Sequence, residues 1–464
     1  MPRPLMRPSL WSYALAHRLQ AVFCIALIVR LANLATLRGR DAFFAEADTI
    51  IYWRLGTALA TPGEFSATLL SMTERMPLYP LFLAGVQSVF GDAPRAVALI
   101  QASIDAGTCV LIAALGGLLT PIIGLIAGLL AALSINLIVY SSQILTDTLF
   151  LFFTSAMLLA GALFLRTPSN QLAVVAGLAG GLGLLTRPLL ALLLLAAVPV
   201  VFAVGIVHRR ALAPSLIATL LFAAAAFLPA TPVLIRNVVH YGAWSLSTQT
   251  GAHLAYWIVP LVTQRANGTP YQITVDQMKA LVTQRMAAGG LGAGSNPFAV
   301  AAIKSELARE QLARLPVSAF VRSWLEGMVV NLGAPALLLD PRARALPKPS
   351  FYNTPGRTLW EKVQAYLFDD PGLYQVLLLV GLAGTLPFVL LSAFGLALLR
   401  RMQLWGAMFA LGTAFYFLMI NGPVAAPKYR LPIEPLLIVC SAIPLAWIVG
   451  RRLEFTPSPP ASLG

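Results

Sequence analysis

The chain has 464 residues, of which 58% are hydrophobic and only 11% charged, and its mean hydropathy is +0.79. A soluble fold needs far more charge to cover its surface, so this composition argues against a soluble globular protein. The net charge of +14 does not indicate nucleic-acid binding, because much of the excess lies at the ends of apolar runs and no basic helix carries interleaved aromatic residues.

Ten apolar runs are long enough to cross a hydrocarbon core of about 30 Å as helices. Their ranges are 19–37, 96–119, 121–140, 147–165, 171–187, 188–207, 212–235, 373–399, 404–421 and 432–450. The first run lacks a convincing cleavage site, so we interpret it as the first spanning helix and not as a cleaved signal peptide. The sequence therefore predicts an all-α polytopic membrane protein.

A further apolar run, 79–90, is short for a span and typical of a re-entrant or interfacial helix. The positive-inside rule decides between these readings. If the run does not cross, all compact basic clusters at helix ends fall on one side; if it does cross, the later clusters face away from the N-terminus. The clusters are Arg3, Arg7 and Arg18, then Arg166, 208–210, 400–401 and 451–452. We therefore predict ten spans, two cytoplasmic termini and a half-inserted helix at the outer face.

This topology divides the chain into three parts. They are a transmembrane core at 1–235 with a first outer loop at 38–95, an outer segment at 236–372, and C-terminal spans with a cytoplasmic tail at 373–464. The outer segment alternates Gly/Ser/Asn/Pro-rich stretches with helical patterns near 274–288 and 298–330. It is expected to form a small, irregular subdomain with amphipathic helices that lies on the membrane.

Ionisable residues at the outer ends of the spans must face water, a partner or a ligand, because lipid does not solvate them. On the predicted topology these and their aromatic neighbours are Glu46, Asp48, Tyr52, Glu74, Arg75, Asp147, Arg187, Arg236, Lys428, Tyr429 and Arg430. A carboxylate can act as general base toward a hydroxyl, and arginines in a partly dry site can stabilise a phosphate leaving group. The mixture suits transfer of a group from a lipid-linked phosphate.

Five segments of the chain carry a resemblance to a known family. They read EADTIIY at 46–52 with ERMPLYPLFLA at 74–84, then SQILTD at 142–147, LTRP at 185–188, IRN at 235–237 and KYRLP at 428–432. In this order they resemble GT-C glycosyltransferases, in particular the branch of aminoarabinose–lipid A and galacturonosyl–lipid A transferases and protein O-mannosyltransferases. That family often has proline at the position of Met76, so the loop geometry of this chain departs from the pattern there.

The resemblance implies a GT-C bundle with outer juxtamembrane helices, a sugar donor on a polyprenyl phosphate, and an inverting reaction with a first-loop Asp as base. Asp48 is the first candidate for the base, with Glu46 as the fallback and Asp147 as a third carboxylate in the site. The residues expected to bind the donor phosphate are Arg75, Arg236, Lys428 and Arg430. Those expected to position substrates are Tyr52, Glu74, Arg187 and Tyr429.

Each of these residues also has a structural alternative. A carboxylate at the start of a helix can simply cap it, and a basic residue at the end of a span can snorkel to the interface. Two further acids lie within or just inside spans: Asp105 is expected to bond a neighbouring helix, and Glu434 to support Arg430. No metal-binding motif occurs, so the sequence requires no cofactor; a divalent metal stays open, with Glu74 and His253 as weak ligand candidates.

The expected function is an inverting glycosyltransferase at the outer face of a bacterial inner membrane. Its partners would be a polyprenyl-phosphate sugar, a lipid, glycan or protein acceptor with a free hydroxyl, and membrane lipids. A transporter or lipid flippase is the first alternative, but it would need ionisable groups near the midplane and gating halves. A surface-polysaccharide polymerase or ligase and a non-catalytic relative are the others.

Overall fold

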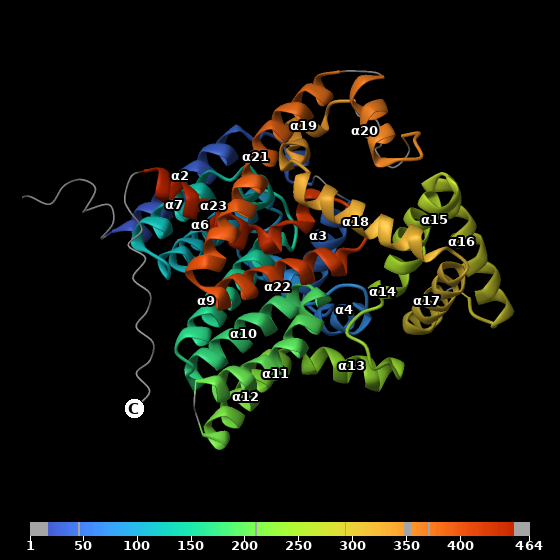
Figure 1. Ribbon diagram of the computed structural model, residues 1–464. Helices are drawn as coiled ribbons and strands as arrows, with labels where there is room; N and C mark the ends of the chain where they lie inside the picture. Colours follow the sequence, from blue (N-terminus) through green and yellow to red (C-terminus); the bar gives the residue numbers. More distant parts are fainter. Residues whose placement is uncertain are drawn as a thin grey trace, which may run out of the picture.

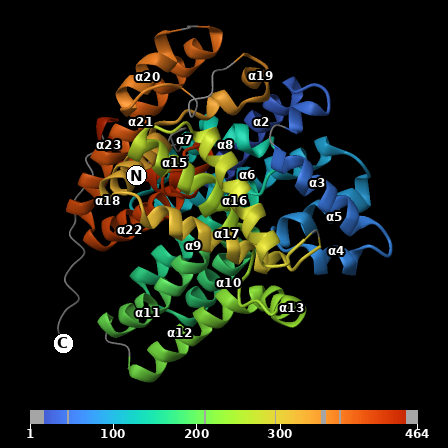
Figure 2. The same ribbon diagram turned by 90° about the vertical axis from the view of Figure 1, so that its right-hand side faces the viewer.

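The fold is taken from a computed structural model that describes residues 17–44, 47–208, 211–292, 294–347, 354–369 and 372–449. Over these residues the chain is helical, without a strand (Figures 1 and 2). The α-helices are α2 (Arg18–Thr36), α3 (Ala47–Ala60), α4 (Phe65–Ser71), α5 (Leu78–Phe90), α6 (Pro94–Gly117), α7 (Pro121–Leu133), α8 (Ile135–Ser141), α9 (Asp147–Arg166), α10 (Asn170–Thr186), α11 (Ala191–Val207), α12 (Leu212–Phe227), α13 (Thr231–Tyr241), α14 (Gln249–His253), α15 (Val259–Asn267), α16 (Tyr271–Ala288), α17 (Pro297–Ala313), α18 (Val317–Gly333), α19 (Pro341–Arg344), α20 (Leu359–Phe368), α21 (Leu373–Met402), α22 (Leu404–Asn421) and α23 (Glu434–Ile448).

Within the described residues, eight helices are long and apolar enough to cross a membrane. They are α2, α6, α9, Pro188–Val207, Leu212–Tyr241, α21, α22 and Pro427–Ile448. The bent pair of α7 and α8 makes a ninth span if it is counted as one, and α10 is an apolar helix of 17 residues. Each of the ten predicted spans therefore has a counterpart, and the prediction of a multi-pass helical membrane protein is confirmed. The short run at 79–90 forms α5, an apolar helix of only 13 residues.

The predicted straight span at 121–140 is instead two helices that meet at 52°. The break is at Ser134, whose backbone is extended and whose hydroxyl accepts a hydrogen bond from the N–H of Leu137 to start α8. A break frees carbonyls that lipid cannot satisfy. The buried guanidinium of Arg30 donates to the carbonyl of Ala132 (2.6 Å) and also to that of Ala131 (3.2 Å), which accepts from the N–H of Ser134 as well.

The charge of Arg30 is balanced by Asp105 of α6, whose carboxylate lies 2.7 Å from the Arg30 Nε. Both side chains are almost fully buried. Asp105 was expected to bond a neighbouring helix, and α2 is that helix. The pair therefore joins α2, α6 and the break after α7 in one polar contact inside the bundle.

The long segment after α13 builds a group of helices beside the bundle, visible on the right of Figure 1. Helices α15, α16 and α17 enclose a small apolar core that includes Val259, Met278 and Leu307. The helical pattern at 274–288 corresponds to α16, but the one at 298–330 is two helices, α17 and α18. The interruption falls at Pro316, which has no N–H to continue a helix.

The two ends of the bundle differ in chemistry, and α9 connects them. Its 20 residues span roughly 30 Å. We call the end of the bundle at which α9 begins the Asp147 end. It contains the C-terminus of α10 and the helices α3 and α5. The opposite Arg166 end holds the end of α21, the start of α22 and the basic residues Arg400 and Arg401. The carboxylates of the predicted site are thus separated from the basic clusters by the length of a span.

Close packing of α21 on α23 predicts a sharp difference between two glycines of α21. A Cβ on Gly395 would lie 1.8 Å from the carbonyl oxygen of Cys440, whereas one on Gly384 would meet nothing within 4 Å. We expect Gly395→Ala to cost about 1–3 kcal/mol, because the two backbones must separate. Gly384→Ala should be neutral or slightly stabilising. Thermal unfolding of the purified variants measures this; equal melting temperatures would contradict the packing.

Candidate active site

The first loop builds two packed helices, α3 and α5, at the Asp147 end. Pro77 immediately precedes α5 and Pro80 lies in its first turn, where a missing N–H costs nothing. The helix ends at Gly91, whose φ of 67° favours glycine. Tyr79 and Leu83 on α5 are fully buried. This packing holds the preceding bend, which carries Arg75, against the start of α3.

Asp48 and Arg75 meet at that contact. The Arg75 Nη2 donates to the Asp48 Oδ1 at 2.7 Å, and the guanidinium lies 5.5 Å from the ring centroid of Tyr52. The Asp48 side chain is 40% exposed and that of Arg75 only 14%. The Arg75 Nε is buried and has no hydrogen-bond partner among the described residues. This pair therefore combines an accessible carboxylate with a cation that has donor capacity left.

A second ion pair joins the start of α9 to the end of α10. The Arg187 Nη2 lies 2.7 Å from the Asp147 Oδ2, and its Nε donates to the hydroxyl of Thr146. Arg187 precedes Pro188, which forces an extended backbone and ends α10 at Thr186. Asp147 is 1% exposed. Of the two carboxylates, Asp48 is the one that a substrate can reach.

Tyr52 connects the two ion pairs. Burial raises the pKa of Tyr52; the nearby cations Arg75 and Arg187 lower that pKa, and the carboxylates of Asp48 and Asp147 raise it. The phenol therefore stays neutral at physiological pH. The two ion pairs therefore lie near the same ring and bring two positive and two negative side chains to this end of the bundle.

The segment before α23 brings further predicted residues to this end. Tyr429 lies close enough to Arg187 to act on its charge, and the Lys428 Nζ lies 5.8 Å from the Tyr429 ring centroid. Tyr429 also packs against an apolar cluster that includes Ile258 and Val424. The structure therefore places Tyr429 beside the cluster of Asp48, Arg75, Asp147 and Arg187, with Lys428 next to it.

Arg430 and Arg236 are engaged elsewhere. The Arg430 Nε lies 2.9 Å from Glu434, its Nη1 donates to the carbonyl of Leu332, and both charged side chains are buried. Glu434 thus supports Arg430, as the sequence indicated. Arg236 donates to the carbonyl of Leu69 at 2.7 Å, while its buried Nη2 has no partner among the described residues. Arg430 therefore joins α23 to α18, and Arg236 joins α13 to α4, while the binding of a donor phosphate by either residue stays a prediction.

The remaining candidates are not brought into the cluster. Glu46 lies outside the described residues. Glu74 is exposed, and burial lowers the pKa of His253, so its imidazole is neutral at pH 7. Across the described part of the chain, no three His, Cys, Asp or Glu residues gather as metal ligands would. Glu74 and His253 therefore do not belong to such a group, and the metal requirement stays an open prediction.

The structure adds a residue that sequence reasoning missed, Gln101 of α6. Its amide accepts from the Tyr79 hydroxyl at 2.8 Å and donates to the carbonyls of Ser141 (3.1 Å) and Gln143 (2.7 Å). Tyr79 in turn packs edge-on against Tyr52. Gln101 thus ties α5 to the turn that leads into Asp147. The sequence feature that could have indicated a role for Gln101 is a single amide side chain within an apolar span.

We predict that Gln101→Leu destabilises the protein. The change leaves the Tyr79 hydroxyl and the Ser141 carbonyl unsatisfied, at about 1–3 kcal/mol for each buried polar group, while the Gln143 carbonyl keeps its bond from the N–H of Leu145. The exposed Gln272→Leu is the matched control and should leave the melting temperature unchanged. If the two variants unfold at the same temperature, Gln101 does not hold the turn.

Comparison with known proteins relates part of the chain to a family of transferases. Residues 74–235 match the model of the family described as dolichyl-phosphate-mannose-protein mannosyltransferase. The matched segment contains Arg75, Asp147 and Arg187. As the description states, that family takes mannose from a dolichyl phosphate carrier and transfers it to protein. The match supports the predicted resemblance to GT-C glycosyltransferases, an enzyme class that uses lipid-phosphate-linked sugars.

Two solved structures are similar to the chain, both of ArnT from Cupriavidus metallidurans. The apo crystal structure is 16% identical, with a TM-score of 0.33 over 93% of this chain and 77% of that one. The structure bound to undecaprenyl phosphate is also 16% identical, with a TM-score of 0.32 over 94% and 78%. None of the curated proteins matches the chain.

Proposed function

We propose that this protein is an inverting glycosyltransferase that moves a sugar from a polyprenyl phosphate to an acceptor hydroxyl. The observation that carries the proposal is the arrangement around Arg75. One face of its guanidinium pairs with the accessible Asp48, and its buried Nε has no partner among the described residues. A proton acceptor and a phosphate donor group are therefore adjacent, as transfer from a sugar phosphate requires.

The proposed reaction forms one bond and breaks one. Asp48 accepts the proton of the acceptor hydroxyl while the hydroxyl oxygen attacks the anomeric carbon. The bond from that carbon to the phosphate oxygen breaks, and polyprenyl phosphate leaves with the electron pair. Arg75 donates to the phosphate as its charge grows, which also releases Asp48 from its ion pair. Attack opposite the leaving group inverts the anomeric centre.

The other residues of the cluster prepare the site. Arg187 adds positive charge near the leaving phosphate and is held in place by Asp147 and Thr146. The buried ring of Tyr52 supports the guanidinium of Arg75, and the half-buried Tyr429 beside Arg187 offers a ring surface to substrate. Lys428 supplies a further cation at the edge. In this proposal Arg430 and Arg236 hold the surrounding helices, and the Nη2 of Arg236, which has no partner among the described residues, is the donor that it has left for a phosphate.

The orientation in the membrane follows from charge. We infer that the Asp147 end faces the outside and the Arg166 end the cytoplasm, because the basic helix ends gather at the latter. Both termini would then be cytoplasmic and the membrane a bacterial inner membrane. The long segment 236–372 would cover the site and help select the acceptor, whether lipid A, another glycolipid or protein. A donor tail would enter between spans at the outer leaflet.

Transport fits the charge distribution less well. A transporter needs ionisable groups at the midplane that a solute or ion can reach. The buried pair of Arg30 and Asp105 lies within the bundle, but both side chains are closed off and hydrogen-bonded to each other and to backbone. The accessible carboxylate, Asp48, lies at the Asp147 end. No feature of the described residues favours a flippase over a transferase.

The proposal is tested by comparing envelope glycolipids and glycoproteins from cells with and without the gene, by mass spectrometry. Deletion should remove one sugar modification, wild-type protein should restore it, and Asp48→Asn should not. The variant must be present at wild-type level in the membrane fraction. Identical glycan profiles with and without the gene would reject a transferase function under those conditions of growth.

A further inference from the structure

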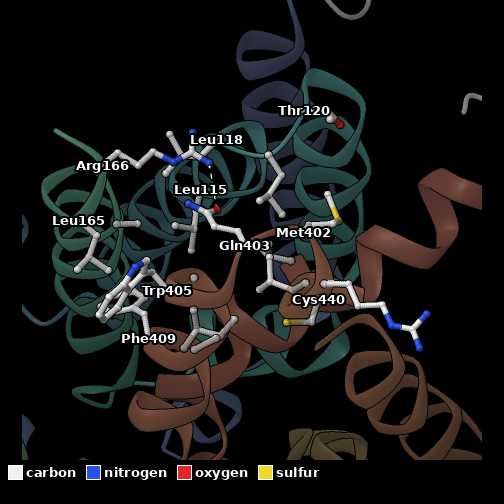
Figure 3. A pocket seen from close by; sticks show the side chains of 18 of the residues that line it. Leu115, Leu118, Thr120, Leu165, Arg166, Met402, Gln403, Trp405, Phe409 and Cys440 are labelled. Carbon is white, nitrogen blue, oxygen red and sulfur yellow. Dashed lines mark hydrogen bonds between the residues drawn. The ribbon is translucent and has the colours of Figure 1, made fainter. Parts of the chain in front are cut away.

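A large cavity opens at the Arg166 end, far from the proposed active site (Figure 3). Its volume is about 850 Å³, and it lies among the ends of α6, α9 and α21, the start of α22 and the body of α23. Asp147 is at the other end of α9, roughly 30 Å away along the helix. A donor held at Asp48 and Arg75 cannot use this cavity for its phosphate.

The cavity is amphipathic. Its interior is lined by apolar side chains from several spans, among them Leu115, Leu165, Phe409 and Leu436. A smaller apolar cavity of about 110 Å³ shares Leu165 and Phe409 with it and extends between α9 and α11. The two cavities are thus neighbours that share part of their apolar lining, and the larger one has room for a hydrocarbon chain.

The polar lining is entirely neutral or basic. Arg166, His208 and Arg401 are among the lining residues, and no Asp or Glu is. The Arg166 Nη2 reaches only the side-chain amide of Gln403, at 3.4 Å, as the dashed line in Figure 3 shows. Within the described part of the chain neither Arg166 nor Arg401 forms an ion pair. Positive charge without a carboxylate beside an apolar cavity is complementary to an amphiphile with an anionic head.

Trp405 marks the depth of the cavity in the membrane. It lines the cavity and is 57% exposed, and Figure 3 shows it beside Phe409. Exposed tryptophans at the ends of membrane spans are typical of the level of the lipid head groups. The basic residues of the cavity lie at helix ends, at that same level, while its apolar lining continues into the bundle.

We propose that this cavity is a binding site for an anionic membrane phospholipid, distinct from the donor site. The head-group phosphate is held by Arg166 and Arg401 at the rim, and one acyl chain occupies the apolar interior. Bound there, the lipid fills the space between α9, α21 and α23 and links helices that otherwise leave a gap. The site recognises the charge of the head group, so a zwitterionic phospholipid binds more weakly.

The test uses the full-length protein in nanodiscs of equal parts phosphatidylglycerol and phosphatidylethanolamine. After extraction into detergent, native mass spectrometry counts the phospholipids that stay bound. Arg401→Gln is compared with Arg400→Gln, which removes the same charge one residue away but does not line the cavity. We expect about fivefold less retained phosphatidylglycerol for Arg401→Gln and about 25-fold less for Arg166→Gln/Arg401→Gln, with Arg400→Gln unchanged.

Each of several results would overturn the proposal. Two of them are equal retention of the two phospholipids by the wild-type protein and equal loss of lipid in Arg400→Gln and Arg401→Gln. A third is full retention of phosphatidylglycerol in the double variant. A fourth is no retained lipid in any form of the protein, which is expected if another segment of the chain fills the cavity. Displacement of phosphatidylglycerol by polyprenyl phosphate at equal concentration would also overturn it. Because Arg401 is exposed, its single variant keeps the test valid if the double variant does not fold.

Discussion

Replacing Asp48 by Asn should lower the rate of sugar transfer by roughly 10²–10⁴-fold, the usual contribution of a positioned general base. An Asn side chain can still accept the hydrogen bond from Arg75, so the local structure should persist. It cannot accept the proton of an acceptor hydroxyl. Because Asp48 is 40% exposed, the melting temperature should change little. The loss should therefore appear in kcat far more than in the amount of folded protein.

The control for this variant is Glu64→Gln in the same loop. Glu64 is exposed, precedes α4 and takes no part in the cluster around Tyr52. It should transfer sugar at the wild-type rate. Asp147→Asn is informative as a contrast, because Asp147 is buried against Arg187 and its loss should reduce stability as well as activity. Transfer by Asp48→Asn at close to the wild-type rate would show that another group is the base.

The largest effect on folding should come from Asp105→Ala. This change leaves the guanidinium of Arg30 buried without its counter-charge, which typically costs about 3–5 kcal/mol. Arg30 also holds the carbonyls of Ala131 and Ala132 at the break between α7 and α8. We expect little folded protein after extraction from the membrane. The variant is expressed as a fusion to a fluorescent protein, and the folded fraction is measured by size-exclusion chromatography and by thermal unfolding.

Two comparisons separate this prediction from a general effect of removing a carboxylate. Asp276→Ala removes an exposed partner of Lys279 and should change stability by about 0–1 kcal/mol. Arg30→Met/Asp105→Leu replaces the pair by apolar side chains and should recover part of the stability, although the carbonyl of Ala132 loses its donor. An unchanged melting temperature for Asp105→Ala would contradict the assigned role of the pair.

The helical architecture was predictable because it depends on runs of apolar residues and on the placement of Arg and Lys. The length of the run at 79–90 predicted a short helix, which is α5, while the charge argument that it does not cross the membrane stays a prediction. The break at Ser134 was not predictable, because a serine within a span is compatible with a straight helix. What makes the break stable is Arg30, which lies 104 positions earlier in the chain and is visible only in the fold.

The candidate site was partly predictable for the same reason. Residues at the ends of spans share a level in the membrane, so Asp48, Arg75, Asp147, Arg187 and Tyr429 could be expected at one end. Sequence does not show which of them pair. The pairing of Arg430 with Glu434, one helical turn away, was expected from the sequence, whereas the burial of both side chains is visible only in the fold. Gln101 was missed because its partners are carbonyls and a tyrosine hydroxyl of other helices.

The most direct test of the proposed chemistry is an assay of the purified protein in liposomes. It receives a synthetic polyprenyl-phosphate sugar and an extract of envelope glycolipids and proteins as acceptor. Release of polyprenyl phosphate is measured together with the anomeric configuration of the product by NMR. The account predicts one polyprenyl phosphate released for each sugar transferred, with inversion, and loss of both signals in Asp48→Asn. Movement of the intact donor across the bilayer, with no sugar transferred, would contradict it.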